Sequence, residues 1–168
     1  MSFFNLALLA SVGAVNAMIP DGAWDGITYP NGTMWIKPVG GHDNEAFAVH
    51  PPQESARLSK RLVGCFGTEL DHTGVDRTVD ELKRWAGTGN DLYSYDVPRF
   101  RAYSYLGAVT YYCIASPNSH GNLSVDDVNH ALLNMDNTCA RYTASYYRWD
   151  NSVEVVGKEK DGAPICNL

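Results

Sequence analysis

The chain has 168 residues, 45% of them hydrophobic and 19% charged, a composition typical of a globular protein with a packed core. Its 13 Lys and Arg residues against 19 Asp and Glu residues give a net charge of −6. This balance argues against nucleic acid as a partner, because binding to phosphates needs a basic face. No apolar run reaches the ~20 residues that a membrane helix requires, so we expect no membrane span.

The first 17 residues have the pattern of a secretory signal peptide. They carry no charge and are mostly apolar from Phe3 to Val15. Val15 and Ala17 are small residues before a cleavage point after Ala17, although no Lys or Arg stands at the front of the segment. The alternative is a buried N-terminal helix. We predict cleavage after Ala17 and a secreted, extracellular protein.

Residues 18–61 are rich in proline and glycine, contain no cysteine and lack a sustained helical or strand period. The segment ends in the dibasic pair Lys60-Arg61, which follows a polar stretch and resembles a processing site of fungal secretory pathways. We predict that residues 18–61 form a propeptide that is cut after Arg61. The alternative is an ordered N-terminal arm anchored by four aromatic residues: Trp24, Tyr29, Trp35 and Phe47.

Residues 62–168 then form the mature domain, and all four cysteines lie in it: Cys65, Cys113, Cys139 and Cys166. An even number of cysteines in a short secreted chain predicts two disulfides, for which three connectivities exist. The spacing contains no CxxC and no Cys/His cluster of the kind that binds zinc. The length is enough for one core and too short for two domains.

The apolar pattern predicts the order β-α-β-α-β-β. A first strand covers residues 62–66, and Val75 to Ala86 repeat at helical spacing before Gly87. Residues 102–116 are expected to form one central strand with a bulge at Gly107, with Tyr103, Tyr111 and Cys113 on one face. Two strands at 142–149 and 153–157 form a hairpin, and a short strand at 165–166 ends the chain.

The clearest element is a helix that ends at Cys139. Ser124 can cap its first turn, and Asp127 completes a capping box. Val128, Leu132, Met135 and Cys139 recur on one face, so this face is expected to pack on the sheet. Together these elements predict an α+β fold: a small antiparallel or mixed sheet, two helices on one face, and two disulfides.

The order and spacing of three features resemble the killer-toxin-like family of small secreted fungal proteins and the related necrosis-inducing-factor family of fungal effectors. The features are Ala102-Tyr103 leading into Cys113-Ile114-Ala115, the helix that ends at Cys139, and the terminal hairpin that ends at Cys166. The resemblance implies a secreted, disulfide-bonded α/β sandwich that acts on other organisms by toxicity or by manipulating a host. Killer toxins of this kind have more cysteines and are more basic, so no ion-channel activity and no functional residue is carried over.

We expect the disulfides to join Cys65 with Cys139 and Cys113 with Cys166. Cys139 lies on the sheet-facing stripe of its helix, where it can fix the short first strand, and Cys166 can hold the chain end against the central strand. The resemblance implies the same link between the first strand and the end of the second helix. The other two connectivities remain open.

No catalytic motif is present, and we expect no cofactor and no metal. Glu69, Asp71 and His72 lie close together in sequence and could form an acid–base pair, but three polar residues in an exposed loop are more often simply solvated. A second set lies on one face of the helix that ends at Cys139, at a spacing that could hold a metal ion: Asp126, Asp127 and His130. The two acids already have another explanation, because the helix dipole favours negative charge in the first turn.

Tyrosine and tryptophan are abundant near the end of the chain. We predict a binding surface on the terminal hairpin, formed by Arg141, Tyr147, Arg148 and Trp149, because these residue types are enriched at binding sites. The alternative is that tyrosine merely fills strands, where it is common. Two glycosylation sequons begin at Asn31 and Asn122.

These observations favour a non-enzymatic secreted effector or toxin-like protein. It would act as a monomer on a host or competitor by binding an extracellular protein or glycan. The alternatives are a small secreted hydrolase, either a ribonuclease or a glycosidase, and a carbohydrate-binding module.

Overall fold

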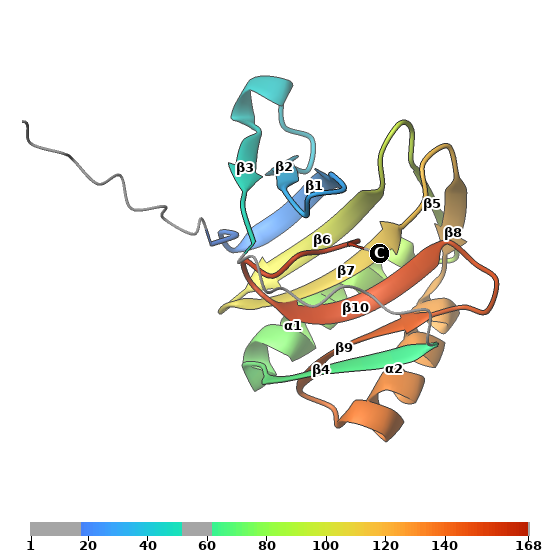
Figure 1. Ribbon diagram of the computed structural model, residues 1–168. Helices are drawn as coiled ribbons and strands as arrows, with labels where there is room; N and C mark the ends of the chain where they lie inside the picture. Colours follow the sequence, from blue (N-terminus) through green and yellow to red (C-terminus); the bar gives the residue numbers. More distant parts are fainter. Residues whose placement is uncertain (1–17, 52–61, 168) are drawn as a thin grey trace, which may run out of the picture.

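The computed structural model describes residues 18–51 and 62–167, and in them the chain forms an α+β fold, as predicted. Eight strands make one antiparallel sheet in the order β3-β2-β1-β6-β7-β10-β9-β4 (Figure 1). The strands of this sheet are β1 (Gly22–Thr28), β2 (Met34–Pro38), β3 (Phe47–Val49), β4 (Val63–Glu69), β6 (Arg99–Tyr105), β7 (Ala108–Ile114), β9 (Thr143–Arg148) and β10 (Glu154–Lys160). A separate two-stranded sheet pairs β5 (Asn90–Tyr93) with β8 (His120–Leu123). The helices are α1 (His72–Ala86) and α2 (Val125–Cys139), with a short 3-10 helix at Asp43–Glu45.

Both helices pack on the same face of the large sheet. Helix α2 starts with the predicted capping box, in which the Ser124 hydroxyl accepts from the amide of Asp127. Helix α1 starts one turn earlier than its apolar pattern indicates, because Asp71 caps it by accepting from the amide of Gly74. Gly74 also lets the helix approach the sheet closely, since a Cβ there would lie 2.6 Å from the carbonyl oxygen of Tyr105.

The other face of the sheet carries a second apolar cluster. Along β7, the side chains of Tyr111 and Cys113 point into this cluster, while those of Tyr112 and Ile114 point toward the helices. The cluster also contains Ile165 and Cys166 from the C-terminal tail. Strand β7 is therefore buried on both faces, which explains why its sequence is apolar throughout.

The expected single strand at 102–116 is wrong, because these residues belong to two strands, β6 and β7, joined by a tight turn. Leu106 and Gly107 form this turn with φ angles of +49° and +75°, so Gly107 is a turn residue and not a bulge. The turn also changes which side chains share a face, and Tyr103 packs on the helix side, opposite to Tyr111. Because both strands are largely buried, the hydrophobic pattern continues through the turn without a visible break.

Two further expectations need correction. The loops on either side of this hairpin contain strands β5 and β8, which are too short to show a period in the sequence. The last residues, including Ile165 and Cys166, do not form a strand but an irregular tail. The tail is nevertheless fixed, because the Ile165 carbonyl accepts a hydrogen bond of 2.6 Å from the hydroxyl of Thr28.

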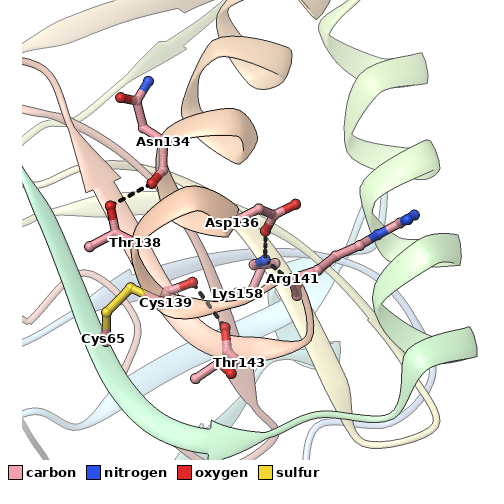
Figure 2. Close-up of a disulfide and its surroundings, with 9 residues drawn as sticks. Cys65, Asn134, Asp136, Thr138, Cys139, Arg141, Thr143 and Lys158 are labelled. Carbon is pink, nitrogen blue, oxygen red and sulfur yellow. Dashed lines mark hydrogen bonds and ion pairs between the residues drawn. A yellow bond between two sulfur atoms is a disulfide. The ribbon is translucent and has the colours of Figure 1, made fainter.

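The disulfides join Cys65 to Cys139 and Cys113 to Cys166, which confirms the predicted connectivity. The first bond ties the edge strand β4 to the last residue of α2 (Figure 2). The second ties β7 to the C-terminal tail, and the Cα atoms of the two pairs lie 5.4 and 5.7 Å apart.

Residues 18–51, which we call the N-terminal arm, supply β1, β2 and β3. Strand β1 pairs with β6 over six residues, so the arm continues the sheet that residues 62–167 form. Trp24 is buried and Phe47 packs edge-on against it with ring centroids 5.7 Å apart, whereas Tyr29 and Trp35 are exposed. The predicted cleavages involve Ala17, Lys60 and Arg61, which lie outside the described residues. Processing at these positions therefore stays a prediction.

Candidate functional site

The four residues predicted as a binding surface do not form one patch. Tyr147 is only 8% exposed and lies under α2, where its hydroxyl is 3.0 Å from Nε2 of His130. Trp149 packs edge-on against the Tyr147 ring, and the Arg148 guanidinium donates to the carbonyl of Ser152. Residues 147 and 149 thus belong to the contact between helix and sheet. Tyr147 is therefore not on an open surface, because α2 covers it, and a binding role for the other three residues stays a prediction.

Arg141 lies at the other end of β9, after helix α2. Its guanidinium donates to Asp76 of α1 at 3.0 Å and sits over the ring of Tyr142. Nearby, Lys158 reaches from β10 toward the helices, is 1% exposed, and donates to Asp136 and to the carbonyl of Arg141 (Figure 2). These contacts hold the loop after α2 against the sheet and α1, beside a hollow of about 580 Å³ between the helices.

The candidate acid–base residues have partners that explain them structurally. Asp71 is the N-cap of α1. Nε2 of His72 lies 3.6 Å from a carboxylate oxygen of Glu69, and its ring stacks on Tyr142 with centroids 3.7 Å apart. Both side chains are largely exposed to solvent.

Two residues of the second set, Asp127 and His130, also have structural partners. Asp127 closes the capping box, and His130 contacts Tyr147. In residues 18–51 and 62–167, no group of three His, Cys, Asp or Glu side chains could hold a metal ion. No helix in the same residues is long and apolar enough to cross a bilayer.

A groove that the sequence does not predict runs along the N-terminal arm. It follows the face of β1 opposite to the buried side chains of Trp24 and Thr28, and consists of two adjoining cavities of about 320 and 360 Å³. Both cavities are lined by Ile27, Tyr29 and Arg99, so they form one continuous depression. We call this feature the aromatic groove and define it by the side chains that line it: Asp25, Ile27, Tyr29, Trp35, Lys37, Asp43, Tyr95, Asp96 and Arg99.

Three aromatic rings of the groove are open to solvent. The exposed fractions are 38% for Tyr29, 44% for Trp35 and 67% for Tyr95. Trp35 comes from β2, Tyr29 from the turn after β1, and Tyr95 from the loop after β5, so two distant segments of the chain build the groove. Large exposed aromatic side chains that gather in one depression are typical of a binding site.

Two of the three carboxylates that line the groove, Asp25 and Asp43, are held in ion pairs. The guanidinium of Arg101 binds both carboxylate oxygens of Asp25, at 2.6 and 3.1 Å, and its other face lies over the ring of Trp85. Lys37 donates to Asp43 at 2.6 Å, and this bond lowers the pKa of the Asp43 carboxyl. The groove therefore presents oriented hydrogen-bonding groups with little uncompensated charge.

Sequence reasoning missed this site because it treated the arm as irregular. The sequence identifies Tyr29 and Trp35 only as possible anchors for an ordered arm. The short alternation Met34-Trp35-Ile36-Lys37 is the signal that could distinguish core residues from groove residues. Met34 and Ile36 are buried, and Trp35 and Lys37 face the groove. Nothing in the sequence indicates that Tyr95 lies beside them.

The two sequon asparagines, Asn31 and Asn122, are exposed. The Asn31 side-chain oxygen accepts from the amide of Thr33, and the Asn122 side chain donates to Asp91 of the paired strand β5. Glycosylation at these positions stays a prediction.

Comparison of the chain with protein-family models, with curated proteins and with solved structures found no match. The resemblance to killer-toxin-like proteins therefore rests on the sequence pattern alone.

Proposed function

We propose that the chain is a secreted, disulfide-bonded protein that acts on a host or competitor organism by binding an extracellular component, and that it does so as a monomer. The observation that carries this proposal is the aromatic groove, with Tyr29, Trp35 and Tyr95 exposed in one depression.

Secretion is supported by two independent features. The first 17 residues have the composition of a signal peptide. All four cysteines are paired, and disulfides persist in the oxidising conditions outside the cytosol.

Binding is supported over catalysis by the state of the groove carboxylates. Asp25 accepts hydrogen bonds from two nitrogens of the Arg101 guanidinium, and Asp43 accepts one from Lys37. A general acid needs a proton to give, and the lowered pKa of Asp43 keeps that carboxyl ionised. Exposed Trp, Tyr and Arg side chains, by contrast, are the groups that supply most of the energy at binding surfaces.

The proposal is tested with fluorescently labelled full-length protein on cell walls from plants, fungi and bacteria. We expect retention on at least one wall type, lost in Trp35→Ala and in Tyr95→Ala. The matched control is Tyr93→Ala, because Tyr93 is 49% exposed but stacks on His120 outside the groove. Failure of every wall type to retain the protein, or retention unchanged in both groove variants, would overturn the proposal.

A second candidate function is a small secreted hydrolase, favoured by the 3.6 Å contact between Glu69 and His72 and by the Arg141 guanidinium beside the Tyr142 ring that stacks on His72. A carboxylate, an imidazole and a guanidinium in one area could support phosphate-ester or glycosidic cleavage. This reading predicts turnover of RNA or of a wall glycan by the purified protein, abolished by His72→Ala or by Glu69→Gln. No turnover with either substrate class would exclude it.

A further inference from the structure

We infer that the ligand of the aromatic groove is a neutral glycan chain and not a protein segment; this inference rests on the proposed function, in which the groove is the binding site. Three properties of the groove carry it: the exposed ring faces, the balance of charge, and the lack of a free sheet edge on β1 and β2.

The first property is the set of aromatic surfaces. A sugar ring has an apolar face of C–H groups and a rim of hydroxyls. A flat aromatic side chain that is open on one side can take the apolar face. Trp35 and Tyr95 belong to the two different cavities, and Tyr29 lines both. This succession of rings along an elongated depression fits several consecutive sugar units better than a single one.

The second property is charge. The groove is lined by three carboxylates, Asp25, Asp43 and Asp96, and by two cations, Lys37 and Arg99. A third cation, Arg101, is not among the lining side chains but binds Asp25, so these six charges sum to zero. Phosphate polymers and strongly charged peptides need uncompensated charge of one sign. A sugar hydroxyl both donates and accepts, so it can bind a carboxylate and a neighbouring guanidinium without disrupting either ion pair.

The third property concerns the backbone. Extended peptides commonly bind by adding a strand to a free sheet edge. Strand β1 is paired on both sides, with β2 and with β6, and β2 is paired with β1 and with β3. The strands beneath the groove therefore have no free edge for a peptide, and recognition depends on side chains alone.

The experiment compares retention on the binding wall type before and after exhaustive proteolysis of the wall. The competitor is a pool of neutral oligosaccharides released from the same wall by partial acid hydrolysis and passed through an anion exchanger. We expect retention to survive proteolysis and to be displaced by the pool. We also expect the affinity for the pool to fall at least about tenfold in Trp35→Ala and in Tyr95→Ala, with Tyr93→Ala unchanged.

Retention that is lost on proteolysis would overturn the glycan assignment while leaving the proposed function intact, since a wall protein would then be the partner. Retention that survives proteolysis but is not displaced by the neutral pool would also overturn it. Absence of retention on any untreated wall is a different result, because it refutes the proposed function itself. Circular dichroism of the variants checks that they fold, which the exposure of both side chains leads us to expect.

Discussion

The N-terminal arm and the part that follows it are stabilised in different ways. Residues 62–167 contain both helices and both disulfides, and each helix packs a continuous apolar stripe on the sheet. The arm has no cysteine and no α-helix. It is held by the pairing of β1 with β6 (Figure 1). Buried side chains also hold it, among them Trp24, Met34 and Ile36.

The N-terminal arm has the weaker hydrophobic periodicity of the two regions, and yet it carries most of the aromatic groove. The three strands of the arm need little periodicity of their own, because β1 pairs with β6 and β2 and β3 then extend the sheet from β1. Because the arm covers Phe100 and Tyr111 in the second apolar cluster, the core of residues 62–167 is not complete without it. The predictions below test this dependence, in order of decreasing expected effect.

The largest effect is expected from removing the arm. A chain of residues 62–168 loses five buried apolar side chains: Ile19, Trp24, Met34, Ile36 and Val49. At about 1.5–3 kcal/mol each, their burial contributes roughly 10 kcal/mol, which is comparable to the whole stability of a domain. We expect this chain to lack a cooperative unfolding transition and to bind a hydrophobic dye, as measured by near-ultraviolet circular dichroism and dye fluorescence.

The matched control for this truncation is the folded protein cleaved after Arg61, in which the arm is still present. Strand β1 would keep its pairing with β6, so the two pieces are expected to elute together in size-exclusion chromatography and to separate only in denaturant. A stable, cooperative fold of residues 62–168 alone would show that the arm is dispensable and would contradict both expectations.

The second prediction compares the contributions of the two disulfides to stability. They close loops of 74 and 53 residues, so each is expected to contribute about 4 kcal/mol to the free energy of unfolding. Cys113→Ala/Cys166→Ala should cost more than Cys65→Ala/Cys139→Ala, because it also releases the C-terminal tail that bonds to Thr28 of the arm. Urea unfolding of both double variants measures the difference, and a larger loss for the Cys65–Cys139 pair would refute the tail's role in holding the arm.

The third prediction compares a buried and an exposed tryptophan of the arm, and it concerns a smaller change in the free energy of unfolding. Trp24 is buried and donates to the carbonyl of Pro20, so Trp24→Ala should cost about 3–5 kcal/mol. Trp35 lies one strand away and is exposed, so Trp35→Ala should change the free energy of unfolding by less than about 0.5 kcal/mol. Urea titration measures both, and equal losses would mean that Trp35 also has a structural role.

Elements with strong local signals were predictable from the sequence. The capping box at Ser124 and the stripe that ends at Cys139 specify a helix and the direction of its last thiol. These positions favour the observed disulfide pairing, but the sequence alone leaves the other two connectivities open. The turn at Leu106 was not predictable, because both flanking strands are buried on two faces and the apolar pattern does not change there.

The site was less predictable than the fold. The aromatic groove depends on tertiary contacts that bring Tyr95 into the same cavity as Tyr29, and no short-range pattern encodes this. The residues that the sequence predicts as a binding surface, such as Tyr147, are of types that are common at binding sites. However, composition does not indicate which face of a strand a helix covers.

The smallest of the four effects concerns a carboxyl group on β10. Glu159 faces the second apolar cluster near Tyr111, is 6% exposed, and accepts a hydrogen bond from the amide of Lys160. Burial raises the pKa of this carboxyl from its usual value of 4.5 to about 7. The folded protein thus keeps a proton at pH values where the unfolded chain has lost it.

The free energy of unfolding should therefore fall by on the order of 3 kcal/mol as the pH rises from about 4.5 to about 7. Above that range, Glu159 should cause no further change in stability. Glu159→Gln keeps the shape and removes the charge, so its free energy of unfolding should exceed that of the wild type at pH 8 and vary less with pH. Asp150→Asn is the control, because Asp150 is an exposed carboxylate in the turn between β9 and β10. Urea unfolding at several pH values measures these differences. A wild-type stability that rises between pH 5 and 7, with Glu159→Gln following the same curve, would mean that Glu159 is ionised in the folded protein.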